Sequence, residues 1–166
     1  MENPVYYESQ RMRLWWVYLI CAGILGLAAW IFVRQIVMGI PTGTNPAPDW
    51  GVWAILAFAV WLVVLILLIT LKLRISEKGV EIRFIPFTHK RFSWDKIESM
   101  EVVEYHPIKD FGGWGIRYNW KQRGKAFTVS GHHGLSITMK DGKKVLIGTY
   151  KPEKLKLFVA KSPYLK

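Results

Sequence analysis

Two long stretches without charge constrain the fold of this chain more than any other feature. Leu14 to Val33 is a run of twenty uncharged residues, and Gly51 to Leu71 is a second run of twenty-one. About twenty apolar residues, each rising 1.5 Å along a helix, cross the roughly 30 Å hydrocarbon core of a bilayer. We therefore predict transmembrane helices at 14–34 and 51–71, joined by a short external loop at 35–50.

The first run has a second interpretation, because Arg11 and Arg13 precede it as basic residues precede a cleaved signal peptide. The apolar part of a signal peptide usually has about 7–15 residues, and small residues mark its cleavage site. Here the run is longer, and the bulky residues 30–32 follow Ala28 and Ala29. These features favour a retained helix.

Basic residues near the two runs predict the orientation of the hairpin. Arg11 and Arg13 precede the first run, Lys72 and Arg74 follow the second, and the loop between them adds only Asp49. Lys and Arg close to membrane ends tend to stay cytoplasmic. We expect a multi-pass protein with both termini in the cytoplasm.

Small residues within the first run allow close helix packing. Cys21 is the only cysteine, so an intrachain disulfide and a cysteine-based zinc motif are both excluded. Ala22 and Gly26 lie four apart on one helical face, the spacing of small-xxx-small contacts. This face suits close approach of the second helix or contact between two copies of the chain.

The net charge of +11 belongs to one part of the chain. Residues 1–71 hold three basic and three acidic side chains, whereas residues 72–166 hold twenty basic and nine acidic ones. Anionic headgroups attract such residues at about 1 kcal/mol each, and positive-inside bias and solubility are the alternative explanation. Nucleic acid is not an expected partner, because no nucleic-acid-binding signature accompanies the charge. The candidate headgroup contacts are Lys72, Arg74 and Lys78.

Residues 72–166 show the alternation of half-buried strands. Val80, Ile82 and Phe84 share one face, while Glu81 and Arg83 point to the other. The same alternation recurs at 135–140, directly before a strong hairpin signal, Asp-Gly at 141–142. We predict about seven strands in an antiparallel β sandwich or barrel, with residues 1–13 as a separate N-terminal tail.

The end of the chain has helical periodicity instead. Pro152 suits a first helical position, and Leu155, Phe158 and Val159 follow at the spacing of one helical face. We predict one amphipathic helix that covers an open end of the β domain.

Three segments carry a resemblance to a known family: RFSWDKIESMEVV at 91–103, DFGGWGIR at 110–117, and FTVSGHHGLSITMKDGKKVLIGTYKPEKL at 127–155. In this order they resemble bacterial pleckstrin-homology-like (PH-like) domains, and the whole chain resembles small bacterial membrane proteins with such a domain after a two-helix anchor. The resemblance implies an integral membrane protein of the bacterial inner membrane with an α+β PH-like domain. The short turn SEKG at 76–79 departs from the basic loop of phosphoinositide-binding relatives in eukaryotes.

The glycines of DFGGWGIRYNW, residues 110–120, have three interpretations. A phosphate loop would need a following Gly-Lys-Ser/Thr and a helix, but strand-like residues follow instead. Glycines at the start of a strand set its backbone conformation, which we assign to Gly112, Gly113 and Gly115. Aromatic and arginine side chains are also enriched at protein interfaces, so a possible interaction edge consists of Phe111, Trp114 and Arg117.

No motif supports catalysis. His132 and His133 are consecutive, His89 and His106 stand alone, and no hydrolase elbow or zinc-peptidase helix occurs. We predict no enzyme activity, no metal and no cofactor. The predicted function is a non-catalytic, membrane-anchored module that binds a protein partner or its own copies, and the alternative is recognition of anionic lipid headgroups.

Overall fold

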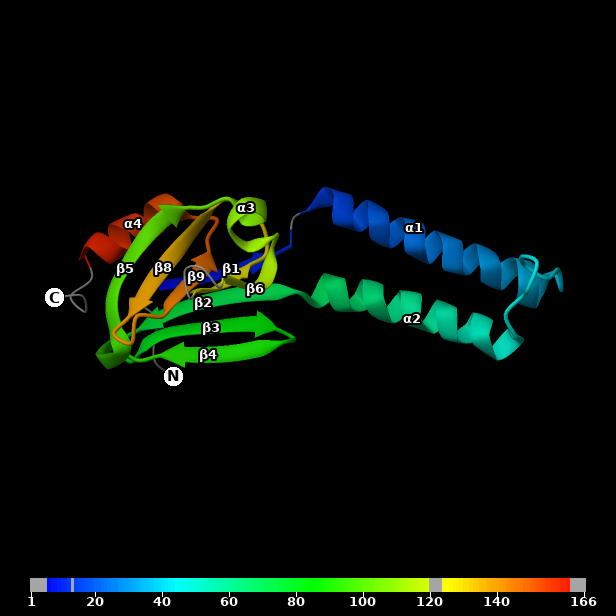
Figure 1. Ribbon diagram of the computed structural model, residues 1–166, viewed down its shortest axis with the longest axis horizontal. Helices are drawn as coiled ribbons and strands as arrows, with labels where there is room; N and C mark the ends of the chain where they lie inside the picture. The colour runs from blue at the N-terminus through cyan, green and yellow to red at the C-terminus, as the bar shows by residue number, and fades with distance from the viewer. Residues whose placement is uncertain (1–5, 13, 120–123, 162–166) are drawn as a thin grey trace. The chain divides into compact units, whose positions relative to one another are not determined.

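The computed structural model describes residues 6–12, 14–119 and 124–161 of the chain. The chain divides into two compact units: a helical unit, Leu14–Leu68, and a β unit in which Met1–Arg13 joins Ile69–Lys166 (Figure 1). The β unit is therefore discontinuous in sequence.

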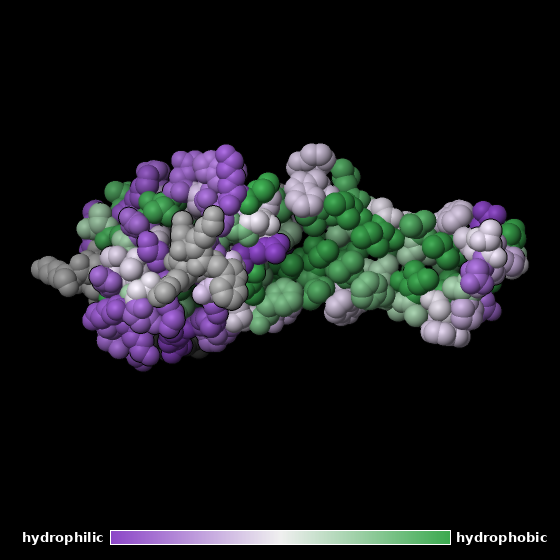
Figure 2. All heavy atoms as spheres, in the orientation of Figure 1, coloured by the Kyte–Doolittle hydropathy of each residue, from purple (hydrophilic) through white to green (hydrophobic). Residues whose placement is uncertain are grey.

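The helical unit contains two long apolar helices. Helix α1 spans Trp15–Phe32 and continues as a π-helical turn, η1, at Val33–Val37, and α2 spans Asp49–Leu68. Both are long and apolar enough to cross a membrane. Hydrophobic residues cover their visible surface (Figure 2), and a helix that is apolar all round belongs in a large core or a membrane. The two predicted helices are confirmed, with α2 ending three residues earlier than expected.

Small side chains form the contact between α1 and α2. The buried residues of the helical unit are Cys21, Ala28, Val52 and Ala59. Ala22 and Gly26 lie exposed on α1, and a Cβ atom placed on Gly26 would meet nothing within 4 Å. The close approach of the second helix to this face does not occur. Contact between two copies there stays a prediction.

Sheet A of the β unit has four antiparallel strands in the order β1-β2-β3-β4. They are β1 Tyr6–Arg11, β2 Thr70–Ser76, β3 Gly79–Ile85 and β4 Thr88–Phe92. The tail at 1–13 thus contributes a strand to the domain, although we expected the domain to start at residue 72. Strand β1 pairs along its whole length with β2, from Tyr6 opposite Ile75 to Arg11 opposite Thr70.

Sheet B has five strands in the order β5-β8-β9-β7-β6. They are β5 Ile97–Glu104, β6 Gly115–Asn119, β7 Gly124–Thr128, β8 His133–Met139 and β9 Lys144–Gly148. A short 3-10 helix, η2 Trp94–Lys96, precedes β5, and a five-residue helix, α3 Pro107–Phe111, separates β5 from β6.

The expectation of a purely antiparallel domain of about seven strands is wrong in two respects. Nine strands occur in the described residues, and β7 pairs with β9 in parallel. The Asp141-Gly142 turn folds β9 back onto β8, with Thr138 opposite Lys144. Strand β9 thereby inserts between β8 and β7, so two strands far apart in sequence become parallel neighbours.

The inner faces of both sheets and the last helix form one hydrophobic core. Helix α4 spans Pro152–Lys161 and contacts β5 and β8. Its Leu155 is fully buried, and Phe158 and Val159 pack against the core, which confirms the predicted amphipathic helix. A smaller cluster of Tyr105, Ala126 and Leu146 lies apart from this core, with Phe111 of α3 packed on it.

Candidate interaction site

The segment DFGGWGIR at 110–117 is a helix end followed by a turn into an edge strand. Gly112 ends α3 in the left-handed conformation, with φ 70° and ψ 22°, and its N–H donates to the Ile108 carbonyl at 2.9 Å. Gly113 and Gly115 follow with φ of 124° and 116°. Residues with a Cβ rarely adopt such φ values. The three glycines therefore turn the chain from α3 into β6.

The side chains of Phe111 and Trp114 are half-buried within the β unit. The ring of Phe111 meets that of Tyr105 edge to face, with centroids 6.1 Å apart. The indole N–H of Trp114 donates to the Gly131 carbonyl at 3.1 Å. These contacts hold the segment between α3 and β6 against sheet B, so both aromatic side chains have a structural role.

The exposed side chains of this edge lie further along β6. Ile116 and Tyr118 are 42% and 44% exposed, and Arg117, also exposed, donates its Nε–H to the Trp114 carbonyl at 3.2 Å. Ile116 lies opposite the buried Phe127 on β7. Directly paired residues share a face of the sheet, so the core face of sheet B continues onto exposed apolar side chains of β6. Of these three residues, only Arg117 belongs to the predicted interaction edge.

A groove of about 550 Å³ opens between the edge strands of the two sheets, β4 and β6. On β4, Thr88 and Lys90 pair with the buried Phe84 and Ile82, so both project to the core-facing side. Three of the described lining residues are cationic and none has a carboxylate, but Arg117 pairs with Ala126 and so lies on the opposite face of the sheet from Ile116 and Phe127. The lining residues are Thr88, Lys90, Ile116, Arg117, Tyr118, Lys125 and Phe127.

The outer face of sheet A gathers basic side chains from three strands. The two cross-strand rows on this face are Lys72, Arg83 and His89, and Arg74, Glu81 and Arg91. Five of these six residues are lysine, arginine or histidine, and the buried face of the same strands is apolar. We call this set the basic face. Two of its members, Lys72 and Arg74, are predicted headgroup contacts.

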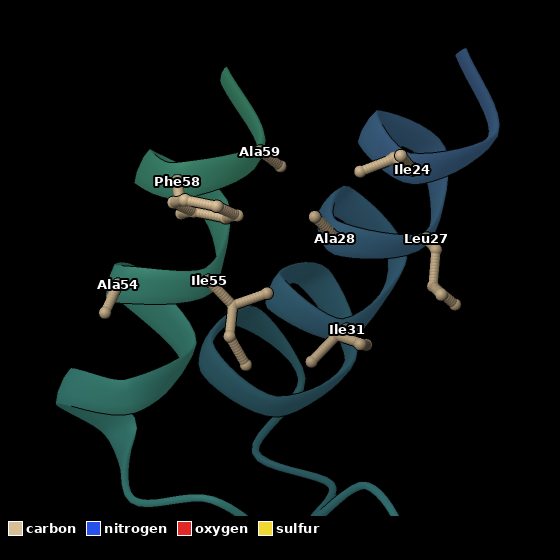
Figure 3. A pocket seen from close by; sticks show the side chains of 8 residues that line it. All are labelled: Ile24, Leu27, Ala28, Ile31, Ala54, Ile55, Phe58 and Ala59. Carbon is tan, nitrogen blue, oxygen red and sulfur yellow. The ribbon is translucent and has the colours of Figure 1, made fainter. Parts of the chain in front are cut away.

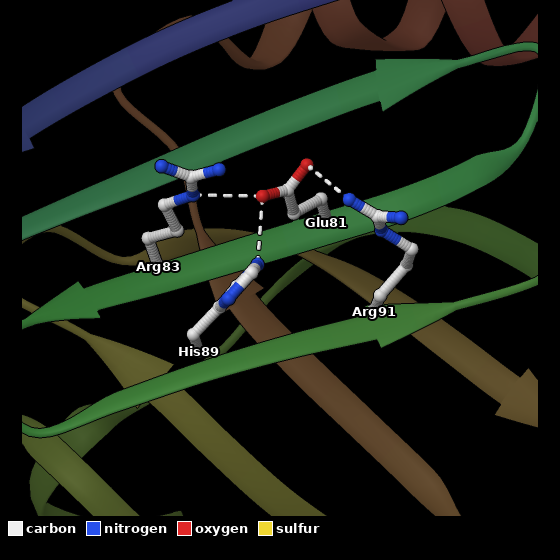
Figure 4. A network of polar contacts seen from close by, with 4 residues as sticks. All are labelled: Glu81, Arg83, His89 and Arg91. Atoms are coloured by element: carbon white, nitrogen blue, oxygen red, sulfur yellow. Dashed lines mark hydrogen bonds and ion pairs between the residues drawn. The ribbon is translucent and has the colours of Figure 1, made fainter.

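Glu81 binds three of the basic side chains at the centre of this face (Figure 4). Its Oε1 lies 2.7 Å from the Nε of Arg83 and 2.7 Å from the Nε2 of His89, and its Oε2 lies 3.5 Å from Arg91. Burial, the largest single effect, raises the pKa of Glu81, whereas hydrogen bonds from Arg83 and His89 lower it. The nearby charges of Arg83 and Arg91 act in the same direction, and the net pKa is below the ordinary 4.5. Glu81 thus stays ionised and neutralises part of the basic face.

Lys78 lies away from the other predicted headgroup contacts. It occupies the turn between β2 and β3, at the opposite end of β2 from Thr70. The strand from Thr70 to Ser76 spans about 20 Å at 3.3 Å per residue. Lys78 therefore does not share a headgroup with Lys72, which lies near the start of the strand.

A buried polar network that no sequence pattern predicted joins β1 to the segment before α4. Glu8 is 2% exposed and accepts hydrogen bonds from the Thr149 hydroxyl and the Tyr150 N–H, both at 2.7 Å. Gln10 is fully buried and donates to the Gly148 carbonyl at 2.6 Å. No sequence signal marks these residues, because alternation rules place polar side chains on the outer face of a strand.

The helical unit has a hollow of its own, of about 400 Å³ (Figure 3). Small side chains, including Ala28 on α1 and Ala59 on α2, leave this space between the helices. Every lining residue is apolar: Ile24, Leu27, Ala28, Ile31, Ala54, Ile55, Phe58 and Ala59. The described hollow offers no side chain that donates or accepts a hydrogen bond.

The histidines do not come together as metal ligands. Within the residues that the structure describes, no three His, Cys, Asp or Glu side chains lie close enough to hold a metal ion. The His132 carbonyl accepts the Tyr105 N–H at 2.8 Å, which is a backbone contact between loop and strand end.

The chain matches no protein-family model and no curated protein sequence.

Proposed function

We propose that this chain is an inner-membrane protein of bacteria whose two helices cross the bilayer and whose β unit lies in the cytoplasm. Two exposed apolar helices support the crossings. Arg11 pairs with Thr70, so the strands that flank the two helices, β1 and β2, are neighbours in one sheet. Both ends of the hairpin must then lie on one side of the membrane. Basic residues beside both ends support the cytoplasm as that side.

The proposed identity of the β unit is a PH-like domain. Strands β2, β3 and β4 form an antiparallel meander, and β5, β8 and β9 pair antiparallel in the second sheet, followed by α4. Two sheets closed by a single C-terminal helix are the arrangement that the sequence resemblance implies. The hairpin of β6 and β7 adds two strands to the outer edge of the second sheet.

The orientation can be tested with reporter fusions. A reporter after Arg74 would interrupt β2, so the fusion belongs at the C-terminus, with a second fusion in the loop at Thr44. A cytoplasmic reporter should be active at the C-terminus and inactive at Thr44. Periplasmic activity of the C-terminal fusion would overturn the proposed orientation.

The function that the geometry supports best is binding of a protein partner, or of another copy of the chain, by a non-catalytic module at the membrane surface. The carrying observation is the edge of β6, where Ile116 and Tyr118 expose apolar surface beside Arg117. Exposed apolar and aromatic side chains with an adjacent arginine are the composition of interaction surfaces.

A photo-crosslinker tests this function in the membranes of the native host. It replaces Tyr118 at the edge, and a matched variant replaces Tyr7, which is 51% exposed on β1. Tyr118 should yield a discrete adduct that Tyr7 does not, and an adduct of two 19.3 kDa chains would identify self-association. Absence of an adduct from Tyr118, or the same adducts from both positions, would overturn the proposal.

The second candidate function is recognition of anionic headgroups, and the basic face supports it. Helix α2 ends at Leu68, and Lys72 lies on β2 two residues beyond Thr70, about 7 Å along the strand. Anionic lipids attract cations near the surface at about 1 kcal/mol each. Such contacts would orient the β unit, because the two helices already retain it at the membrane.

A further inference from the structure

We propose that the turn between β3 and β4 inserts Phe87 into the interface of the bilayer that α1 and α2 cross, and so holds the β unit against the membrane. This role rests on the proposed membrane crossing and adds a lipid contact made by the β unit itself. Three observations carry it: the residues of the turn, its place in sheet A, and the cations that flank it.

The turn between β3 and β4 is apolar and exposed. It consists of Pro86 and Phe87, and Phe87 is 54% exposed. Proline is common in turns, but phenylalanine is not among the residues that dominate them. The Phe87 N–H donates to the carbonyl of the buried Phe84 at 2.8 Å, and the centroids of the two rings lie 6.1 Å apart. The turn therefore holds an aromatic ring in place with about half of its surface uncovered.

The other two hairpin turns among the described residues are polar and lie at the opposite end of the β unit. They are Glu77-Lys78, between β2 and β3, and Asp141-Gly142, between β8 and β9. Helix η2 joins them, because its indole N–H donates to the Ser76 carbonyl at 3.1 Å and its last carbonyl accepts the Lys140 N–H at 3.0 Å. The β unit thus has charged turns at one end and the apolar turn at the other.

The apolar turn lies at the end of sheet A where β1 ends and β2 begins (Figure 1). Ile85, the last residue of β3, pairs with Thr70, which also pairs with Arg11. Only Ile69 separates Thr70 from the end of α2. The twenty residues of α2 rise about 30 Å, the thickness of the hydrocarbon core. In the proposed crossing, Thr70 and Ile85 therefore lie at the level of the headgroups, and the turn extends beyond them toward the bilayer.

Two cations follow the turn on the outer face of sheet A. Arg83 and His89 pair with each other, about 7 Å along the strand from Ile85. A hollow of about 500 Å³ extends from them to the turn, and its lining residues are Arg83, Phe84, Ile85, Pro86, Phe87, Thr88 and His89. A cation binds the phosphate of a phospholipid by charge-assisted hydrogen bonds. The hairpin thus matches the order of groups in a lipid layer, with the apolar ring toward the acyl chains and the cations at the phosphates.

The apolar ring is the main contact in this arrangement. Arg83 and His89 both bind Glu81, which neutralises part of their charge. Phenylalanine is among the side chains that interfacial segments bury at the boundary between headgroups and acyl chains. We therefore expect the contact to form on lipids without net charge, unlike electrostatic recognition of anionic headgroups by the basic face.

The test measures depth with nitroxide labels on the full chain in phosphatidylcholine nanodiscs. Single cysteines are introduced in a Cys21→Ala background. Molecular oxygen concentrates in the bilayer and a nickel chelate stays in water, so the ratio of their collision rates with the nitroxide reports depth. The positions are Phe87→Cys, Glu77→Cys at the charged end, and Val60→Cys on α2. The ratio at position 87 should exceed that at position 77 about threefold or more, because an interfacial side chain lies about 5–10 Å into the boundary.

A second label, Pro86→Cys, shows whether Phe87 makes the contact. Phe87→Asp should lower the ratio at position 86 to that of position 77, because a carboxylate is costly to remove from water. The conservative change Phe87→Leu should keep the ratio high. Tyr7→Asp is the matched control, since it also replaces an aromatic residue that is about half exposed, but on β1; it should leave the ratio unchanged. Circular dichroism melts check that all variants fold.

The three label positions separate failure of this inference from failure of the membrane crossing. A high ratio at position 60 with equal ratios at positions 87 and 77 would show that the helices cross the bilayer and that the turn does not touch it. A low ratio at position 60 would refute the crossing itself. An unchanged ratio at position 86 in Phe87→Asp, or an equal loss in Tyr7→Asp, would show that Phe87 does not hold the β unit at the membrane.

Discussion

The Glu8 carboxylate accepts the backbone N–H of Tyr150 at 2.7 Å, which joins the first strand of the chain to the residues that lead into its last helix. Glu8 is 2% exposed and also accepts the hydroxyls of Tyr6 and Thr149, each at 2.7 Å. A buried carboxylate is costly unless hydrogen bonds replace its hydration. The three donors therefore hold β1 in one position on the β unit.

Replacing Glu8 with alanine should destabilise the β unit by about 3 kcal/mol or more, because each buried donor left without a partner costs about 1–3 kcal/mol. The measurement is the thermal or denaturant midpoint of the β unit in detergent, followed by near-ultraviolet circular dichroism. Ser9→Ala, at an exposed position of the same strand, is the matched control and should shift stability by less than about 0.5 kcal/mol. Equal effects of both changes would contradict the role of the network.

Asparagine substitutions at Gly112 and Gly115, in the turn before β6, should differ in their cost to stability. Gly112 has left-handed helical angles, which asparagine also adopts, so Gly112→Asn should cost less than about 1 kcal/mol. Gly115 has φ 116°, outside the region that asparagine favours, so Gly115→Asn should cost about 1–3 kcal/mol. Thermal melts of the two variants provide the test. Indistinguishable melting temperatures would show that the turn tolerates a changed backbone conformation at position 115.

Glu81 should make stability depend on pH in the acid range. Its pKa is lower in the folded protein than the ordinary 4.5, so its contribution is present above pH 4.5 and is lost as pH falls through the folded pKa. Glu81→Gln should remove this part of the pH dependence. Thermal midpoints from pH 6 to pH 3 measure it, with Glu98→Gln as an exposed control on β5. An unchanged pH profile in Glu81→Gln would contradict the ion cluster.

A soluble β unit should fold only when β1 is kept. Because Arg11 and Thr70 are paired, a turn of about four residues can join Met12 to Ile69 in place of the helical unit. We expect this rewired chain to give a dispersed NMR spectrum. A fragment of residues 72–166 lacks β1 and the first two residues of β2, and should give a collapsed spectrum. A dispersed spectrum from that fragment would show that β1 is dispensable.

The rewired chain also tests the basic face. It should sediment with vesicles containing anionic phosphatidylglycerol more than with phosphatidylcholine vesicles, and added salt should weaken the binding. Lys72→Glu with Arg83→Glu should abolish most of the difference, whereas Lys140→Glu with Lys154→Glu should preserve it. Equal binding to both lipids, or equal effects of the two double variants, would reject recognition of headgroups by this face.

Local patterns predicted the elements whose residues carry their own signal. The uncharged runs predicted α1 and α2, alternation from Val80 to Phe84 predicted β3, and the spacing of Leu155 and Phe158 predicted α4. In each case burial follows the period of the element itself. The pattern of neighbouring residues was therefore sufficient to predict these elements.

Elements that depend on distant partners escaped prediction. Strand β1 turns Glu8 and Gln10 inward, against the alternation rule, because their hydrogen-bond partners are supplied by residues 148–150. The parallel pairing of β7 with β9 depends on where a hairpin inserts, which no local pattern encodes. For the site, Arg117 was predicted, but Lys90 was not, because only the fold brings β4 to the same groove as β6.

Because the β unit is discontinuous in sequence, its first strand is synthesised well before the others. The ribosome makes β1 first, and at about 5–20 residues per second several seconds pass before β2 emerges, because both helices are made between them. If only one helix entered the bilayer across its full width, β1 and β2 would lie on opposite sides and sheet A would lack its first strand. In the proposed topology, completion of sheet A therefore requires that both helices cross the membrane.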